Sequence, residues 1–279
     1  MLKRLVRVWV FCLAACGLSL AAAVREELDV SYLEGAVLAS ADNYRRNQCR
    51  LDLRLPEQSG FSTVIWLHGG GLTSGKRHYP QIDEPGVGVV AVSYRLSPAA
   101  EHPAYLEDTA AAVAWVLRHI AERGGDPKKV FLAGHSAGGY LAAMVGMDPR
   151  WLAAHGHAPK ELAGLMLVSA QVTTHFHVKK LRGDTGHELR PIIDEFAPLF
   201  HVAKDLPPIC CILGDRAIEF KNRVEENALF VTSLRNLGHP FVEFHEMGGL
   251  DHLSIVRGAW IIMPAFMERV LSGRPAAAR

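Results

Sequence analysis

Residues 134–138 read Gly-His-Ser-Ala-Gly and constrain the fold of this chain more than any other segment. They follow a short apolar run at 130–133 and precede a helix-forming run at 140–145. In this context the G-x-S-x-G pattern is typical of a sharp, strained turn between a strand and a helix, with the serine at its tip. Side chains at the flanking positions would collide in such a turn. The pattern therefore predicts a strand–turn–helix unit that presents Ser136 as a nucleophile.

Apolar runs with the character of strands alternate with helical patterns along the rest of the chain. Buried strands are expected at 62–67, 87–92, 130–133, 165–168, 209–213 and 241–244, and edge antiparallel strands at 30–32 and 49–55. Helices are expected at 104–120, 140–145, 224–237 and 255–271. This alternation indicates an α/β fold in which a mostly parallel central sheet of about eight strands carries helices on both faces.

The N-terminal segment has the composition of a secretory signal peptide. Lys3, Arg4 and Arg7 form a basic start, an apolar run follows at 8–20, and small residues stand at 21–23. The run is too short to span a bilayer, and no other stretch of the chain reaches transmembrane length. We therefore expect a signal peptide at 1–23 and one α/β domain at 24–279. Within this domain, the irregular stretch 171–208 is expected to form a partly helical excursion over the active site.

The signal segment also contains a second pattern. Residues 13–16 read Leu-Ala-Ala-Cys, which resembles a bacterial lipobox and would leave a lipidated Cys16. Both interpretations place the mature domain outside the cytoplasm, either periplasmic or secreted.

Residues 68–71 read His-Gly-Gly-Gly and follow the expected strand at 62–67. This is the pattern of an oxyanion loop, in which glycines let the backbone approach the substrate. Gly70 and Gly71 are the candidate N–H donors, and the N–H of Ala137 is a third. Residues 70–76 also fit G-x-x-x-x-G-K, but Arg77 stands where a magnesium ligand would be needed, so no nucleotide is expected.

A candidate base and a candidate acid come late in the chain. His252 lies between the last expected strand and the last expected helix, which matches the order serine, acid, histidine of such hydrolases. The acid is expected just after the strand at 209–213, where Asp215 and Glu219 are both available. In an extended segment the two would share a facing. Asp215 is slightly favoured because it stands at the strand end, while Glu219 is longer and would reach back to His252.

The composition gives no indication of a nucleic-acid partner. The formal net charge is +1, and 21% of the residues are charged. The mature part keeps Cys49, Cys210 and Cys211, which are expected to be small buried residues, although Cys49 pairing with one of the others is the alternative. The histidines at 175 and 177 lack an evident third ligand, so no metal site is expected.

Several of these segments together resemble a known family. Residues 68–71 and 134–139 are similar to motifs of the hormone-sensitive-lipase-type and related esterases of the α/β-hydrolase superfamily. The stretch between them is similar as well, with Ser-Tyr-Arg-Leu-Ser-Pro at 93–98, His-Pro at 102–103 and Gly-Asp-Pro at 125–127. The resemblance covers about residues 60–275. It implies an α/β-hydrolase fold, acyl transfer on Ser136 and no cofactor. Residues 214–227 depart from the family's usual acid loop and resemble acetyl-esterase and kynurenine-formamidase-like members.

These observations predict an exported serine esterase. The expected substrate is a small-molecule or saccharide ester with a short, acetyl-like acyl group. Apolar and histidine side chains of the excursion are candidate walls of the acyl pocket, namely His175, Phe176, His177, Phe196, Leu199 and Phe200. The alternatives are a formamidase or amidase, and a catalytically silent binding protein on the same fold.

Overall fold

The computed structural model describes residues 23–82 and 84–274. The expected signal segment with Cys16 therefore lies outside the described residues, apart from Ala23. Eight strands form one sheet: β1 (Val24–Ser31), β2 (Arg50–Pro56), β3 (Phe61–Leu67), β4 (Val87–Val92), β5 (Gly125–His135), β6 (Gly164–Val168), β7 (Ile209–Gly214) and β8 (Val242–Met247).

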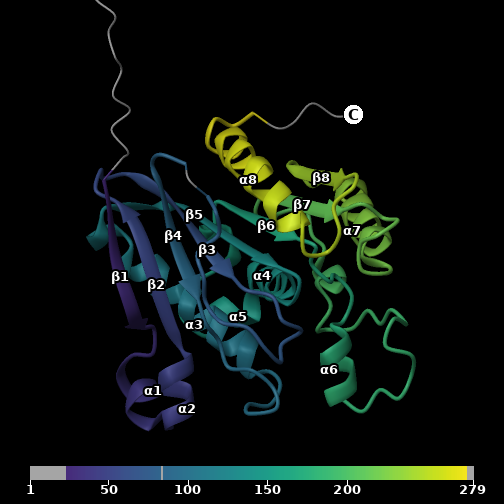
Figure 1. The fold of residues 1–279 in the computed structure, drawn as a ribbon, viewed down its shortest axis with the longest axis horizontal. Coiled ribbons are helices and arrows are strands. Elements are labelled where there is room, and N and C mark those ends of the chain that lie inside the picture. Colours follow the sequence, from purple (N-terminus) through teal and green to yellow (C-terminus); the bar gives the residue numbers. More distant parts are fainter. Residues whose placement is uncertain (1–22, 83, 275–279) are drawn as a thin grey trace, which may run out of the picture.

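The strand order in the sheet is β1-β2-β4-β3-β5-β6-β7-β8. The pairs β1–β2 and β2–β4 are antiparallel, and every pair from β4 through β3 to β8 is parallel. Parallel strands need crossover connections, and from β4 onward the helices between the strands supply them. The expected fold, a mostly parallel sheet of about eight strands with two antiparallel edge strands, is confirmed (Figure 1).

The sheet separates two apolar cores. Along β3, Ile65 and Leu67 pack into the core that contains residues of α3 (Ala104–His119), α4 (Ala137–Met147) and α7 (Arg223–Asn236). Val64 and Trp66 point to the opposite face, where they join residues of α8 (Ile255–Leu271). This alternation is the period of two of a strand that is buried on both faces.

Cysteines follow the same alternation at the centre of β7. Cys210 belongs to the core under α8, and Cys211 belongs to the opposite core. Cys49 is buried as well, and no disulfide links the cysteines of the described part of the chain. All three therefore take the expected role of small buried residues, and Cys49 is not paired.

Three short helices were not expected from the pattern, and a fourth, α6 (Phe176–Leu181), lies in the stretch 171–208 that was expected to be partly helical. The three are α1 (Gly35–Ser40), α2 (Asn43–Gln48) and α5 (Pro149–Ala153). Each of the four is six residues or fewer, which is too short for a 3.6-residue period to stand out. Across residues 23–82 and 84–274, none of the helices combines the length and apolarity needed to cross a bilayer.

The stretch 171–208 contains α6 and a 3-10 helix at Pro198–His201. In Figure 1, α6 and the long loop that follows it project from the body of the domain. The buried Lys179 stabilises this loop, because its Nζ donates to the backbone carbonyls of Glu188 at 2.8 Å and Arg190 at 2.5 Å. Tyr140 of α4 donates its hydroxyl to the Phe196 carbonyl at 3.0 Å and so ties the stretch to the domain.

Candidate active site

Ser136 lies at the turn between β5 and α4. Its backbone has φ 55° and ψ −118°, a conformation that residues with a Cβ rarely adopt. A Cβ on Gly134 would collide with the Gly138 carbonyl group, and a Cβ on Gly138 would collide with the Leu67 carbonyl oxygen. The two glycines therefore make the turn possible, as the motif predicts, and the strained backbone holds the serine hydroxyl at the carboxyl edge of the sheet.

His252 faces this serine from the loop between β8 and α8. Its Nε2 lies 2.9 Å from the Ser136 Oγ. The loop is attached to β5 by His135, whose Nε2–H donates to the His252 carbonyl oxygen at 2.8 Å. Burial lowers the pKa of His135 to about 4, so this ring is neutral. The role of His135 in holding the histidine loop was missed in the sequence, although it occupies the second position of the serine motif.

Glu219 supplies the carboxylate at the other side of the imidazole. Its Oε1 lies 2.6 Å from the His252 Nδ1, and its side chain is 1% exposed. The backbone N–H groups of Gly214 and Phe220 also donate to the carboxylate, at 3.0 and 2.7 Å. Burial raises the pKa of Glu219, but the hydrogen bonds from His252 and Phe220 outweigh burial and lower the pKa to about 2. Glu219 is therefore ionised at neutral pH.

The sequence slightly favoured Asp215 as the acid, whereas the structure places Glu219 beside His252. The segment is a turn rather than an extended chain, because the N–H groups of Ile218 and Glu219 both donate to the Asp215 carbonyl. The Asp215 carboxylate accepts from the backbone N–H groups of Ala217 at 2.9 Å and Gly249 at 2.8 Å, so it braces the loop. The turn instead brings the longer Glu219 side chain under His252.

A fourth side chain contacts the histidine, and it was not predicted. The Ser169 Oγ lies 2.8 Å from the His252 Nδ1. Ser169 follows the last residue of β6, and the carboxyl ends of parallel strands meet at one edge of the sheet. That rule applies to every strand end, so it did not single out this serine.

The glycine loop after β3 lies against the serine turn. A Cβ on Gly69 would stand 3.3 Å from the Ser136 Cβ, and Gly70 and Gly71 have φ values of 113° and 64°. Among the described residues, no acceptor is found for the N–H groups of Gly70, Gly71 or Ala137. These three N–H groups are therefore available to a ligand oxygen, and Ala137 adds the favourable N-terminal end of the α4 dipole.

Two aromatic rings lie next to the histidine and the glycine loop. The Phe220 ring lies 5.5 Å from the His252 ring, and it is nearly parallel to the Phe176 ring at a centroid distance of 6.4 Å. Phe176 in turn comes within 3.6 Å of the position that a Cβ on Gly71 would take. Of the other candidate pocket residues, His175 is buried and stacks on Phe176, whereas Phe200 is exposed.

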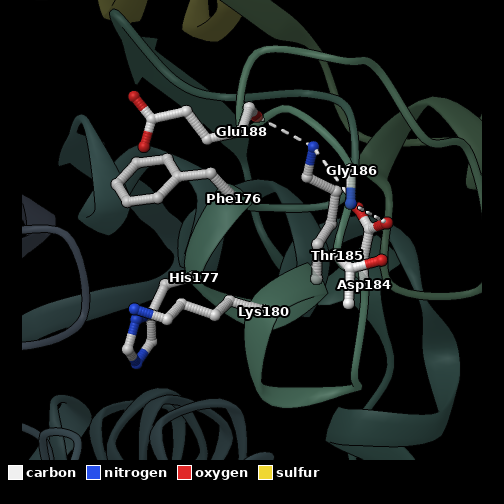
Figure 2. A pocket seen from close by; sticks show the side chains of 8 residues that line it. Phe176, His177, Lys180, Asp184, Thr185, Gly186 and Glu188 are labelled. Atoms are coloured by element: carbon white, nitrogen blue, oxygen red, sulfur yellow. Dashed lines mark hydrogen bonds and ion pairs between the residues drawn. The ribbon is translucent and has the colours of Figure 1, made fainter.

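A cavity of about 340 Å³ opens beside Phe176 within the excursion. Most of the residues that line it are of polar types, among them His177, Lys180, Asp184, Thr185 and Glu188 (Figure 2). The cavity therefore offers charged and hydrogen-bonding groups next to an aromatic ring.

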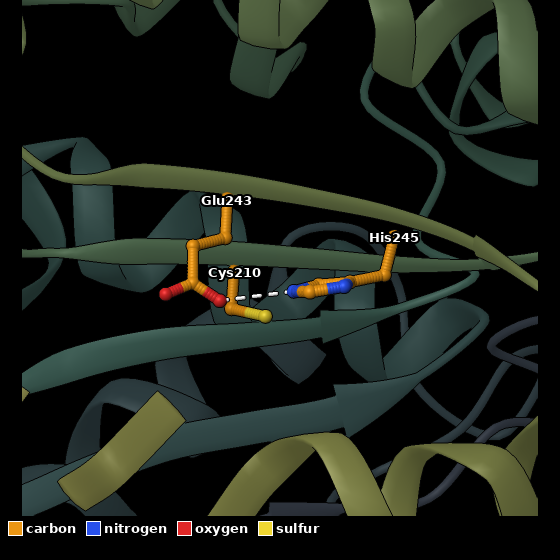
Figure 3. Close-up of side chains that lie close together, drawn as sticks. All are labelled: Cys210, Glu243 and His245. Carbon is orange, nitrogen blue, oxygen red and sulfur yellow. Dashed lines mark hydrogen bonds and ion pairs between the residues drawn. The ribbon is translucent and has the colours of Figure 1, made fainter. Parts of the chain in front are cut away.

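One group with metal-ligand chemistry occurs among the described residues, on β7 and β8. It consists of Cys210, Glu243 and His245 (Figure 3). The Glu243 carboxylate already receives two hydrogen bonds from Arg269, both at 2.7 Å, and one contact from His245 at 2.9 Å. Burial raises the pKa of the Cys210 thiol, which disfavours the thiolate that binds metals. These residues form an ion-pair cluster rather than a fitting metal site.

Comparison with known proteins finds sequence similarity to esterases. The BD-FAE family matches residues 51–161, which include the glycine loop and Ser136. Carboxylesterase NlhH of Mycobacterium tuberculosis is 42% identical over 88 residues, 29% of this chain and 28% of that protein. The probable carboxylic ester hydrolase LipM of the same species is 27% identical over 254 residues, 80% of this chain and 55% of that protein. Hormone-sensitive lipase of Bos taurus is 36% identical over 106 residues, 35% of this chain and 14% of that protein. The chain thus spans less than two thirds of the length of these relatives.

Solved structures give the same fold over most of the chain. A truncated carbohydrate esterase from gut microbiota matches with a TM-score of 0.73 and 17% identity, over 89% of this chain and 96% of that one. A propionate-bound esterase from Thermogutta terrifontis matches with a TM-score of 0.66 and 22% identity, over 93% of this chain and 97% of that one. These likenesses confirm the fold expected from the sequence.

Proposed function

We propose that this chain, an α/β-hydrolase of the hormone-sensitive-lipase type, hydrolyses short-chain carboxylic esters through an acyl-enzyme on Ser136. The observation that carries the proposal is the hydrogen-bonded series from the Ser136 Oγ through the two nitrogens of His252 to the Glu219 carboxylate. A serine hydroxyl is a weak nucleophile by itself. A neighbouring base held by a buried carboxylate activates it.

The chemistry follows from the geometry. His252 Nε2 takes the proton of Ser136 as the Oγ attacks the ester carbonyl carbon, and the ionised Glu219 stabilises the imidazolium that results. The oxygen of the tetrahedral intermediate accepts hydrogen bonds from the N–H groups of Gly70, Gly71 and Ala137. Each donor of this kind typically contributes about 10²–10³ in rate. The alcohol leaves with the proton from His252, and water activated by the same nitrogen then releases the acid.

Short acyl groups suit the surroundings of the serine. Phe176 and Phe220 narrow the space next to His252 and Gly71, and rings at these positions leave less room for long chains. The structural relative from Thermogutta terrifontis is described with propionate bound, which agrees with a small acyl group.

The alcohol part of the substrate is proposed to be a saccharide. The cavity next to Phe176 combines an aromatic ring with polar side chains, and a sugar presents both apolar faces and hydroxyl groups to its binding site. The likeness to a carbohydrate esterase supports the same class.

Hydrolysis of a p-nitrophenyl ester series from acetate to decanoate, together with an acetylated oligosaccharide and a matched anilide, tests this proposal. We expect kcat/KM to be highest at acetate or butyrate and acetate release from the saccharide. Anilide cleavage without ester cleavage would instead identify an amidase. No turnover of any substrate would favour a binding protein.

We also propose that the mature protein is exported. The basic start and short apolar run at 1–20 support cleavage after Ala23, and a lipidated Cys16 is the alternative. Mass spectrometry of the mature N-terminus in a bacterial host is expected to find Val24 first. An unprocessed Met1 would contradict export, and a diacylated Cys16 would establish the lipoprotein form.

A further inference from the structure

Ser169 lies in a fixed position beneath the catalytic histidine. It is fully buried and directly follows β6, and its N–H donates to the Ile212 carbonyl of β7 at 2.8 Å. The neighbouring Val168 carbonyl accepts the N–H of Ser136 at 2.9 Å. The peptide group between Val168 and Ser169 is thus held on one side by β7 and on the other by the serine turn.

The backbone of Ser169 is also unusual. Its φ is +46°, in the left-handed region that non-glycine residues rarely adopt. Such conformations are retained where the surrounding structure imposes them, and they concentrate at functional sites. In this conformation the Ser169 Oγ reaches the His252 Nδ1 at 2.8 Å.

The hydrogen-bonding capacity of the imidazole decides what this contact does. Nδ1 of a neutral imidazole carries at most one hydrogen, and both the Ser169 Oγ and the Glu219 Oε1 lie within hydrogen-bond distance of it. If Nε2 is to accept the Ser136 proton, Nδ1 must carry the hydrogen. Both oxygens then act as acceptors of the same N–H. In the other tautomer, Ser169 would donate to Nδ1, and Nε2 would be unable to act as a base.

We propose that Ser169 is a positioning residue whose hydroxyl shares the Nδ1–H of His252 with Glu219. It would hold the ring in the productive tautomer and support the positive charge that the ring gains during attack. This inference rests on the proposed function of the Ser136 site and assigns it a fourth side chain.

Replacing Ser169 with Ala tests the hydroxyl alone, because Ala keeps the Cβ and must adopt the same positive φ. We expect kcat for the best p-nitrophenyl ester to fall about tenfold with little change in KM, since a charge-assisted hydrogen bond is lost. The acidic limb of the pH profile of kcat/KM is expected to move to lower pH. The reason is that an acceptor at Nδ1–H favours the protonated ring, and its removal makes protonation harder.

The other titratable and charged groups around the ring remain in the variant. They are Glu219 from the acid loop, His135 from β5, Asp251 beside His252 in the chain, and Arg223 at the start of α7, which acts on Glu219 and His135. A shift of the acidic limb in Ser169→Ala is therefore assigned to the lost hydroxyl.

Ser169→Gly is the matched variant, because glycine also lacks the hydroxyl but adopts a positive φ freely. Equal losses in Ser169→Ala and Ser169→Gly, with the same shift of the acidic limb, would support the proposal. A Ser169→Ala variant with wild-type kcat and an unchanged acidic limb would overturn the proposal. The role of Ser169 would then be limited to its backbone conformation. Ser233→Ala, which removes a half-buried hydroxyl on α7, is the control for loss of a serine hydroxyl elsewhere.

A measurement without substrate separates this inference from the proposed function. The Nδ1–H proton of His252 is followed by NMR in a Ser136→Ala background, with and without Ser169→Ala. We expect its downfield resonance to move when the hydroxyl is removed. An unmoved resonance would refute the shared hydrogen bond even if esters are hydrolysed. A moved resonance would support it even if no ester is turned over.

Discussion

Glu219→Gln is expected to lower kcat for ester hydrolysis by about 10⁴-fold, whereas Asp215→Asn is expected to change it by less than about tenfold. The first substitution keeps the shape of the side chain but removes the charge at 2.6 Å from the His252 Nδ1. An amide at this position can donate to Nδ1 and so favour the wrong tautomer, which costs about 10⁴ in kcat in a comparable triad. Steady-state kinetics on the best p-nitrophenyl ester measure both effects.

The two variants are matched, because each exchanges one carboxylate for its amide within the same loop. Asp215 accepts backbone N–H groups of Ala217 and Gly249, so its variant reports any general loosening of the loop. Thermal midpoints of both proteins show whether folding is retained. Greater loss of kcat in Asp215→Asn than in Glu219→Gln would contradict the assignment of the acid.

Ser136→Ala is expected to reduce kcat by about 10⁶-fold, since loss of the nucleophile removes the acyl-enzyme route altogether. The glycine loop and the Ala137 N–H remain in place, so binding of the ester and a small residual rate are expected to persist. The wild-type chain is expected to take up one equivalent of a p-nitrophenyl phosphonate on the peptide that contains Ser136, as found by mass spectrometry.

The control for this prediction is Ser233→Ala, because the half-buried hydroxyl lies on α7 and bonds only to the Leu229 carbonyl. It is expected to retain wild-type kcat and to be labelled like the wild type. Turnover by Ser136→Ala within tenfold of the wild-type rate, or labelling of another residue, would refute an acyl-enzyme on Ser136.

The sheet and the serine turn could be predicted from the sequence because their causes are local. Buried parallel strands require continuous apolar runs, and the turn at Ser136 requires glycines on both sides for steric reasons that the structure makes explicit at Gly134 and Gly138. The loop with His252 was placed by its order in the chain. The predictions of the strands and of the serine turn depend on residues that are close together in the sequence.

The identity of the acid that faces His252 could not be predicted from local sequence in this way. Whether Asp215 or Glu219 faces His252 depends on how the segment after β7 turns, and that turn has no periodic pattern. The contact of Ser169 with the histidine could not be predicted from the sequence for a different reason. Its contact with His252 joins the ends of two elements 83 residues apart, and nothing in its immediate neighbours marks it. Short helices such as α6 likewise lack enough turns to show a period.

The side chains of Cys210 and Cys211 point to opposite faces of the sheet, so the reactivity of these two native thiols can report on unfolding. Cys210 lies in one of the two cores, and Cys211 lies in the other together with Cys49. Burial raises the pKa of Cys210 and Cys211, to about 12 for Cys211, so neither of these thiols reacts while its core is closed. The rate at which each is alkylated therefore follows the opening of one layer. A single protein would thus reveal whether the α8 layer or the layer of α3, α4 and α7 separates from the sheet first.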